Sequence, residues 1–318
     1  MITVLAGGVG AARFLQGLLR VHPFSDVTIV SNVGDDTEFF GLHVSPDIDI
    51  VLYHLAGIAD EERGFGVRDD TFHTLDALSR FGYDTWFRLG DRDLATCLTR
   101  THLLRLGRTL AEATAEIARA LGVPAAIIPA TNDRLRTKIR TDAGLLDFQE
   151  FFVKRRAADP VREIIFDGAD SARLANGVLE AIAAANAVLV TPSNPLISIA
   201  PILAVPGLRD ALRGTQAKVV AVSPIVGGAA IKGPAARMLR DQGLEASAVT
   251  VARLYADFLD AIVIDNVDAD LASQIEAADP HGGRQGLAVT VTDTIMSSME
   301  RKAALARATL RAAGVSPS

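Results

Sequence analysis

The residues best placed to do chemistry begin with a glycine-rich turn near the start of the chain. Residues 6–13 read Ala-Gly-Gly-Val-Gly-Ala-Ala-Arg and follow a short apolar run. Glycines that link a strand to a helix let backbone amides approach a diphosphate, and the helix N-terminus favours negative charge. Arg13 stands where a dinucleotide fingerprint has its third glycine. We therefore expect a phosphate-binding turn with Arg13 as an anion clamp, and the alternative is a purely structural turn.

Two acidic clusters follow the second predicted strand. Asp35 and Asp36 end the run Ser-Asn-Val-Gly-Asp-Asp, and Asp47 and Asp49 lie in Pro-Asp-Ile-Asp. In an open α/β sheet both clusters would lie near the carboxyl edge, where ligands bind. Because Mg²⁺ takes oxygen ligands and shares them with substrate phosphates, carboxylates beside a phosphate-binding turn predict a magnesium site. Ordinary acidic turns and helix caps are the alternative.

Three further polar motifs come later in the chain. Residues 86–96 hold the only tryptophan and the triplet Asp91-Arg92-Asp93, which composition alone would assign to a solvated ion-pair turn. Residues 191–198 and 223–228 follow two apolar runs, and their Ser, Asn and free amide groups could hold a nucleotide base or a phosphate. Simple proline turns would explain both segments equally well.

The elements that must position these motifs alternate along the chain. Short apolar, mostly β-branched runs predict strands at residues 2–5, 27–32, 125–129, 187–191, 218–223 and 261–264. Apolar periodicity predicts helices at residues 11–20, 70–80, 110–121, 172–184, 208–213, 235–242 and 297–313. Thr109 and Glu112 form a capping box before the third of these helices. The alternation predicts an α/β, Rossmann-like fold with a mostly parallel sheet and crossover helices.

One stretch breaks this alternation. Residues 137–140 and 145–153 flank Asp-Ala-Gly, a pattern that predicts an antiparallel hairpin, and a charged segment follows at residues 154–162. We expect residues 131–164 to form a small hairpin or cap insertion. Since the chain contains no repeat and no long linker, residues 1–318 are predicted to form a single elaborated α/β domain.

Composition narrows the class of protein. A chain of 318 residues that is 49% apolar can bury a large core. A net charge of −6 leaves no basic surplus for nucleic acid, and no apolar run reaches the roughly 20 residues needed to cross a bilayer. The single cysteine, Cys97, excludes an intramolecular disulfide framework. We expect a soluble, cytoplasmic protein with no nucleic-acid or membrane partner.

The order of the motifs resembles the 2-phospho-L-lactate transferase family, in register from residue 1 to about Met299. The resemblance is carried by residues 5–15, 32–36, 46–49, 89–96, 192–195 and 223–225, with supporting matches at residues 63–72 and 148–152. The turn around Val9 looks like the bacterial branch of the family. Cys97 stands where the family usually has histidine, so we assign that position no role.

The resemblance implies an enzyme of coenzyme F-420 biosynthesis that requires magnesium. Members take a phospho-acid from its guanosine diphosphate adduct, place it on the ribityl hydroxyl of the deazaflavin Fo, and release GMP. The acid can be 2-phospholactate, phosphoenolpyruvate or phosphoglycerate, and the sequence does not choose between them. It also leaves open whether the protein is a homodimer.

The resemblance further implies roles for individual residues. Asp49 and Arg88 would contact the deazaflavin, and Asp35, Asp36 and Asp47 would lie at the magnesium ion. Asp49, followed by Asp36, is the candidate that orients the attacking hydroxyl, while Arg13 stabilises charge on the diphosphate. The predicted donor and nucleotide site consists of Gly7, Gly8, Val9, Gly10, Ala11, Arg13, Asp91, Arg92, Ser193, Asn194 and Ser198.

Two other function classes would use a similar pattern. An NAD-dependent oxidoreductase would have a third glycine in the turn, and an acidic residue that binds the ribose at the end of the second strand. This chain has Arg13 and Asn32 at these positions. A nucleotide-sugar-binding regulatory protein of the same fold would share the glycine-rich start. The Pro-Asp-Ile-Asp and Leu-Gly-Asp-Arg-Asp motifs favour the transferase over both.

Overall fold

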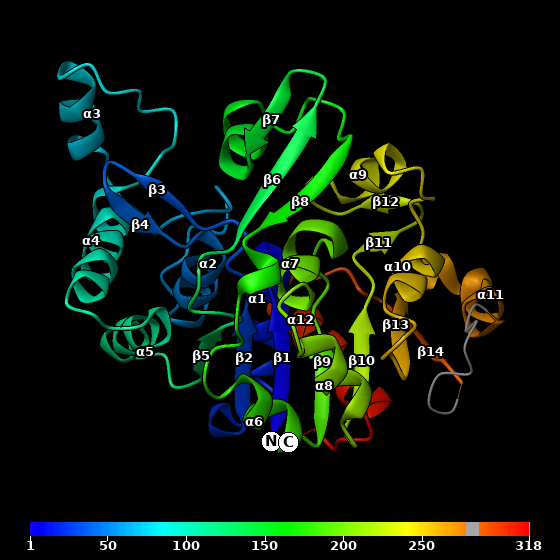
Figure 1. The fold of residues 1–318 in the computed structure, drawn as a ribbon. Coiled ribbons are helices and arrows are strands. Elements are labelled where there is room, and N and C mark those ends of the chain that lie inside the picture. The colour runs from blue at the N-terminus through cyan, green and yellow to red at the C-terminus, as the bar shows by residue number, and fades with distance from the viewer. Residues whose placement is uncertain (278–285, 318) are drawn as a thin grey trace.

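A seven-stranded parallel sheet forms the centre of the computed structural model, which describes residues 1–277 and 286–317 (Figure 1). Across the sheet the strands are ordered β14 (Ala288–Thr292), β13 (Ala261–Asp265), β10 (Lys218–Val222), β9 (Ala187–Val190), β1 (Ile2–Ala6), β2 (Val27–Ser31) and β5 (Ala126–Pro129). The inner strands are buried almost throughout, as expected when helices cover both faces of a parallel sheet. The predicted α/β fold is confirmed.

The strand order reverses at β1. The chain proceeds from β1 to β2 and β5 on one side, and it then returns to place β9 on the other side of β1. In sheets of this kind, the loops that leave the two strands at the reversal diverge and open a crevice at their carboxyl ends. This topology predicts a ligand site between the exits of β1 and β9.

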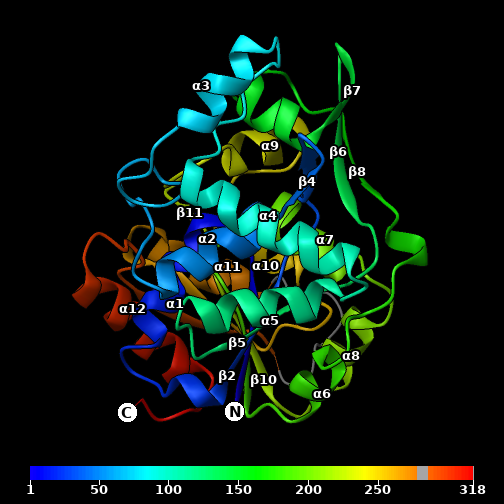
Figure 2. The same cartoon turned by 90° about the vertical axis from the view of Figure 1, so that its left-hand side faces the viewer.

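Helices pack on this sheet and tie the chain ends together. α1 (Gly8–Leu18) packs against α2 (Pro46–Leu55) and against the C-terminal helix α12 (Met299–Ala312), and α4 (Asp91–Arg105) lies beside α5 (Leu110–Ala120), as Figure 2 shows. Both termini lie at the end of the sheet away from the carboxyl ends of the strands. The remaining helices and turns are η1 (Phe24–Asp26), α3 (His73–Arg80), η2 (Glu150–Lys154), η3 (Ala169–Ser171), α6 (Val178–Ala183), η4 (Pro195–Ile199), α7 (Ala200–Leu203), α8 (Leu208–Gly214), α9 (Ala235–Asp241), α10 (Ala248–Leu254), η5 (Asn266–Leu271) and α11 (Ala272–Ala277).

Three small antiparallel sheets lie outside the central one. β3 (Thr37–Phe39) pairs with β4 (Leu42–Val44), and β11 (Ile225–Val226) pairs with β12 (Ala229–Ala230). The third sheet rises above the carboxyl ends of the central strands in Figure 1, with β6 (Arg136–Thr141) between β7 (Gly144–Asp147) and β8 (Glu163–Asp167). We call this sheet, together with η2, the cap.

The cap confirms the predicted hairpin and corrects its length. The strand predicted at residues 145–153 ends at Asp147, and a π-helical turn follows at Glu150–Lys154. This turn buries Phe151 in a separate small core with Ile139 and Val161, which a continued strand would have left exposed. The third strand of the cap was not predicted, and it extends beyond residue 164 to Asp167.

One predicted helix is shorter than expected, and two helices beside the predicted acidic motifs, α2 and α4, were not predicted. The helix predicted at residues 172–184 is only α6, because Leu174 and Ala175 pair with the backbone after β5 instead. The charged triplet at residues 91–93 begins α4 and is not a turn, since the Asp70 carboxylate accepts hydrogen bonds from the Arg92 and Asp93 amides. The Pro-Asp-Ile-Asp motif begins α2, with proline and acidic residues in the first turn that favours them. The predicted capping box at Thr109 is confirmed.

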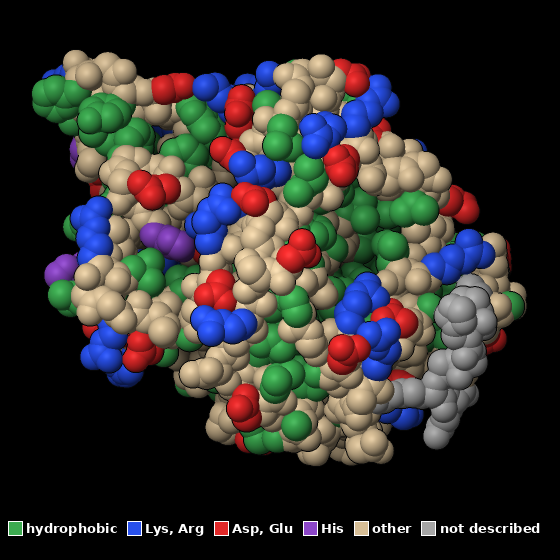
Figure 3. Space-filling model, in the orientation of Figure 1, with side chains coloured by type: hydrophobic (Ala, Val, Ile, Leu, Met, Phe, Trp, Pro, Cys, Tyr) green, Lys and Arg blue, Asp and Glu red, His purple; other side chains and the backbone are tan. Residues whose placement is uncertain are grey.

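The surface shows no large patch of one charge on the face in Figure 3, where acidic and basic side chains are interspersed. Apolar side chains gather over α3, where Phe81 is 80% exposed. Within the described residues, no single helix has the length and apolar composition to cross a bilayer. The segments Pro195–Leu203 and Leu208–Gly214 meet that test only as a pair, and they are bent by 85°.

The contact between α1 and α12 leads to a stability prediction. A Cβ atom at Gly17 would stand 2.2 Å from the Lys302 carbonyl oxygen, so Gly17→Ala must push the two helices apart. We expect a loss of about 1–3 kcal/mol in the free energy of unfolding, measured by urea titration. Gly214→Ala is the control, because a Cβ there meets nothing within 4 Å. Equal stability of the two variants would contradict the close packing.

Candidate functional site

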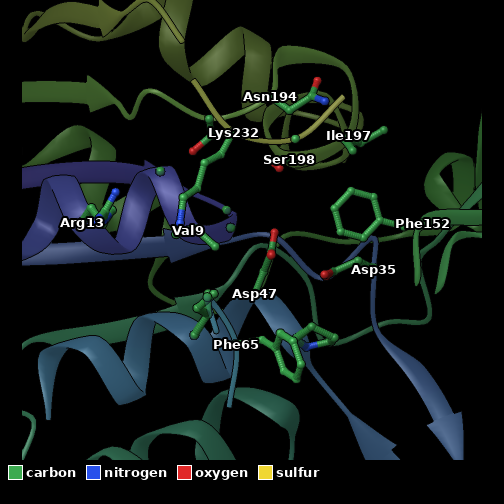
Figure 4. Close-up of a pocket in the computed structure, with 18 of the residues that line it drawn as sticks. Val9, Arg13, Asp35, Asp47, Phe65, Phe152, Asn194, Ile197, Ser198 and Lys232 are labelled. Atoms are coloured by element: carbon green, nitrogen blue, oxygen red, sulfur yellow. The ribbon is translucent and has the colours of Figure 1, made fainter. Parts of the chain in front are cut away.

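A cavity of about 540 Å³ lies at the carboxyl ends of the strands, at the point where the strand order reverses. It is walled by the turn after β1, the start of α2, the loop before α3, the segment before α4, the cap, and the segments that follow β9, β10 and β14. Figure 4 shows side chains from these separate elements pointing into the same space. The topology therefore gathers most of the predicted motifs at one place.

The glycine turn forms one wall of the cavity. α1 begins at Gly8, three residues earlier than predicted, and its N-cap residue has no side chain to cap the first turn. Gly8 has a φ of +73°, and a Cβ at Gly10 would stand 2.2 Å from the Pro192 carbonyl oxygen, so glycine is required at both positions. The Gly8 amide donates a hydrogen bond to the Asp47 carboxylate, and the amides that follow it at the start of α1 are available to an anion.

The predicted residues of this turn divide into two sets. Gly7, Gly8, Val9, Gly10 and Arg13 line the cavity. Ala11 is fully buried among core residues, where its side chain packs against the sheet layer and only its backbone can serve a ligand.

Asp35 and Asp47 bring two carboxylates to the floor of the cavity. Both are buried, and Asn32 donates a hydrogen bond of 2.9 Å to Asp47 Oδ2. Burial raises the pKa of Asp47 to about 6, and burial together with the charges of Asp47 and Asp36 raises the pKa of Asp35 well above its usual value. Two neighbouring buried carboxylates such as these are stabilised by a bound cation or by a proton that they share.

The cap holds the Asp35 segment in place. Gln149 Nε2 donates to the Asp35 carbonyl oxygen at 3.0 Å, and the Thr137 amide donates to the Gly34 carbonyl oxygen at 2.5 Å. The insertion is therefore part of the construction of the site, because it fixes the backbone that presents the Asp35 carboxylate.

These two carboxylates fit Mg²⁺. Among the described residues, Asp35 Oδ1 is a buried oxygen without a hydrogen-bond partner, and Asp47 adds a second oxygen donor. Mg²⁺ commonly binds through one or two carboxylates and completes its coordination with water and substrate phosphates. A second group, Asp49, Asp93 and Cys97, places three potential ligand atoms within 4.8 Å of one another. It suits a hard cation less well, because burial raises the pKa of the Cys97 thiol and a guanidinium occupies Asp49.

Asp36 lies outside the lining of the cavity. Its Oδ2 accepts hydrogen bonds from His43 Nε2 at 2.9 Å and from Ser45 Oγ at 3.0 Å. These contacts tie the loop after β2 to β4 and to the start of α2. The structure thus gives Asp36 a positioning contact, and its predicted role as a metal ligand or catalytic group stays a prediction.

Asp49 lines the cavity and forms a buried ion pair. Both of its oxygens accept hydrogen bonds from the guanidinium of Arg100, which is fully buried in α4. Burial raises the pKa of Asp49, and the Arg100 charge opposes that shift. Each carboxylate oxygen keeps a further lone pair, so Asp49 can still accept a hydrogen bond from a ligand hydroxyl.

Asp93 is a carboxylate in the cavity wall, and the sequence left the role of the Asp91-Arg92-Asp93 triplet open between loop geometry and donor binding. It accepts a hydrogen bond of 2.8 Å from the Tyr53 hydroxyl. Burial, reinforced by the Asp49 charge, raises the pKa of Asp93 to about 7. Composition alone assigned the triplet to a solvated ion-pair turn, whereas Asp93 lies in the first helical turn of α4.

Aromatic side chains line the end of the cavity near Arg88. The Arg88 guanidinium lies 4.2 Å from the centre of the Phe72 ring, and Phe148 stacks on Phe152 with ring centres 5.3 Å apart. Phe65 and Phe152 extend into the cavity in Figure 4. Flat apolar walls beside a planar guanidinium suit a planar ring system.

Asp91 and Arg92 lie away from the cavity lining. Asp91 accepts hydrogen bonds from Thr71 Oγ1 at 2.5 Å and from the His73 and Thr74 amides at 3.0 Å, so it joins α4 to α3. Arg92 donates to the Arg68 carbonyl oxygen at 3.4 Å. These contacts hold the loop geometry, and a role in donor binding stays a prediction.

The segment after β9 supplies the remaining predicted residues. Ser193, Asn194 and Ser198 all line the cavity, and their segment packs directly beside the glycine turn. Ser193 Oγ lies 2.9 Å from Thr191 Oγ1, and Asn194 Oδ1 caps η4 by accepting from the Leu196 amide. Nothing in this geometry selects a guanine base, so their predicted contact with guanosine remains a prediction.

Sequence reasoning missed several further lining residues. Those that bear on the chemistry are Tyr53, Phe65, Phe87, Phe148, Gln149, Phe152 and Lys232. The motifs around Phe65 and Phe148 contributed to the family resemblance, which was the only available signal for them. Lys232 follows the Gly-Gly pair after β10 by four residues, and a basic residue beside a glycine-rich loop could have marked it.

Comparison with known proteins gives a consistent result. The family model described as 2-phospho-L-lactate transferase CofD matches residues 2–303. A phosphoenolpyruvate transferase of Streptomyces coelicolor is 40% identical over 315 residues, covering 97% of each chain. A 2-phospho-L-lactate transferase of Methanocaldococcus jannaschii is 38% identical over 311 residues, covering 96% of each chain. A crystal structure of a upf0052 family member from Bacillus halodurans shares the fold, with a TM-score of 0.60, 16% identity and coverage of 97% of this chain and 98% of that one.

The raised pKa of Asp93 predicts a pH-dependent effect on stability. Because the folded chain binds this proton more tightly than the unfolded chain, stability declines as the pH rises towards the folded pKa of about 7. Asp93→Asn removes the ionisation and keeps an acceptor for Tyr53. Relative to wild type, its free energy of unfolding should rise by about 1 kcal/mol or more between about pH 5 and pH 8.

Asp91→Asn is the control for this measurement. Hydrogen bonds from Thr71 and Thr74 lower the pKa of the exposed Asp91, so its contribution is lost only at acid pH. Its effect should therefore stay constant over the same pH range. A constant difference for Asp93→Asn as well would show that Asp93 titrates normally.

Proposed function

The chain belongs to the 2-phospho-L-lactate transferase CofD family, and we propose that it transfers a phosphate-linked acid from a guanosine diphosphate adduct to the ribityl hydroxyl of the deazaflavin Fo. It is a transferase, consistent with coenzyme F-420 biosynthesis. One observation supports this proposal above the others. A single cavity joins an uncapped helix N-terminus and two buried carboxylates to a wall of aromatic rings.

In the proposed reaction, the acceptor hydroxyl oxygen attacks the phosphorus that carries the acid. A new P–O bond forms to the acceptor, and the P–O bond to GMP breaks with its electron pair leaving on the GMP oxygen. The hydroxyl proton passes to a carboxylate of the cavity. Such a transfer depends on positioning and charge stabilisation more than on a protein nucleophile.

The donor end of the cavity would bind the diphosphate. The amides at Val9 and Gly10 point their partial positive charge at it, and Arg13 adds a full charge one turn along α1. Asp35 and Asp47 would hold Mg²⁺, which when bound neutralises phosphate charge. Ser193, Asn194 and Ser198 face this end and are our candidates for guanosine contacts.

The acceptor end would bind the deazaflavin. Its planar ring fits between Phe65, Phe152 and the Arg88 guanidinium, and Arg88 is held flat by Phe72. Asp49 would accept a hydrogen bond from the ribityl hydroxyl and orient it. Arg100 holds the Asp49 carboxylate by a bidentate contact, so the orientation is set before the substrate binds.

The relatives do not decide which phosphate-linked acid is transferred. The relatives named phosphoenolpyruvate transferase and those named 2-phospho-L-lactate transferase are about equally similar to this chain, at 36–41% identity. Because the glycine turn is of the bacterial type and the Streptomyces relatives are named phosphoenolpyruvate transferases, the guanosine adduct of phosphoenolpyruvate is the first donor to test.

The proposed activity is tested directly with purified protein, Fo and Mg²⁺. Three reactions receive the guanosine adducts of phosphoenolpyruvate, 2-phospholactate or phosphoglycerate, and mass spectrometry follows the acceptor product and GMP. We expect equal amounts of both products with at least one adduct, and none after thorough chelation. Absence of product from all three would refute the proposed function, and full activity after chelation would refute the magnesium assignment.

Asp47 provides a sharper test of the magnesium site. Asp47→Asn keeps an acceptor for the Asn32 amide but removes a charged ligand, so the Mg²⁺ concentration for half-maximal turnover should rise by roughly 10-fold to 100-fold. Asp170→Asn is the control, because Asp170 is exposed and lies outside the cavity lining. An unchanged Mg²⁺ requirement in Asp47→Asn would place the ion elsewhere.

A further inference from the structure

Lys232 is a basic side chain that reaches into the cavity from a segment with no assigned role. In Figure 4 it extends from the segment before α9 towards Val9, in the first turn of α1. Its Nζ also lies 3.9 Å from where a Cβ of Gly64 would be, so it spans from the β12–α9 segment to the loop before α3. The ammonium group therefore lies over the donor end of the cavity.

Two other cations of the cavity wall, Arg63 and Arg88, contact aromatic rings, whereas Arg13 and Lys232 contact none in the described part of the chain. Arg63 pairs with Asp60 at 2.9 Å and lies over the rings of Phe65 and Phe72. Arg88 lies on the Phe72 ring at the acceptor end. Within the described residues, Lys232 makes no hydrogen bond or ion pair, so its charge is not neutralised by the protein. A solvated lysine without a partner, aimed into a cavity, is suited to bind an anion.

The backbone on both sides of Lys232 is anchored. The Gly227 amide donates to both oxygens of Asp268 at 3.1 Å, and Arg240 donates to the Gly228 carbonyl oxygen at 2.7 Å. α9 begins immediately afterwards at Ala235. Residues 231–233 thus form a short bridge between two fixed elements, so the position of Lys232 is set although its side chain remains free to adjust.

Charge balance indicates what this lysine binds. If Mg²⁺ lies between Asp35 and Asp47, the two carboxylates cancel its charge. A diphosphate diester carries about two negative charges, and its leaving phosphate gains another as the P–O bond breaks. Arg13 supplies one positive charge from α1, and a second cation would balance the remaining charge.

We propose that Lys232 is a donor-binding residue that holds the diphosphate of the guanosine adduct against the first turn of α1. This inference rests on the proposed function for the identity of the donor. The contact would supply the second cation from the segment that follows β10, which reaches towards Val9 at the start of α1.

Calorimetric titration with GDP in the presence of Mg²⁺ tests this contact. Lys232→Met should weaken GDP binding about 10-fold to 100-fold, in line with loss of a charge-assisted contact, and Lys232→Arg should stay within a few-fold of wild type. Lys218→Met is the matched control, because Lys218 is an exposed lysine at the amino end of β10, away from the cavity. Its GDP affinity should equal that of wild type.

A parallel titration with guanosine separates phosphate binding from base binding. Lys232→Met should leave guanosine affinity unchanged, and thermal unfolding should show that the variant is folded. Unchanged GDP affinity in Lys232→Met would overturn the inference, as would an equal loss of GDP and guanosine binding. If wild type turns over none of the adducts but Lys232→Met still loses GDP affinity alone, the proposed function fails and the diphosphate contact stands.

Discussion

The close approach of α1 to the exit of β9 is the contact on which the site depends. With any side chain at Gly10, a Cβ atom would stand 2.2 Å from the Pro192 carbonyl oxygen, so only glycine lets the two segments meet. This contact lies where the strand order reverses, and the neighbouring loops diverge on either side of it. The uncapped amides of α1 and the polar segment containing Ser193 consequently face the same cavity.

The two ends of the cavity differ in physical character. Near α1, buried carboxylates at Asp35 and Asp47 are costly in the absence of a cation, and the same burial makes them effective ligands for one. Near Arg88, aromatic rings offer a flat apolar wall that can exclude water. An anionic donor and a planar acceptor would thus be drawn to opposite ends, with their reacting groups meeting between them.

The buried pair of Asp49 and Arg100 connects these ends to the fold. It joins α2, which also carries Asp47, to α4, which also carries Asp93. Removing both charges from water is expensive, and the bidentate contact offsets that cost only while both partners are present. The pair therefore fixes α4 against α2. It thereby also positions the segment before α4, whose residues Arg88 and Leu89 line the cavity.

Local patterns in the sequence determined six of the seven strands of the central sheet, the glycine turn, the capping box at Thr109 and the acidic clusters, because each depends on residues within a few positions of one another. Tertiary structure alone decided which of these residues share a cavity. It turned Asp36 towards His43, paired Asp49 with Arg100, and brought Phe65 and Lys232 to the site from loops with no regular pattern. The physical reason is that a side chain's partner across the fold is chosen by how helices and loops pack, and the spacing of residues along the chain carries no record of that choice.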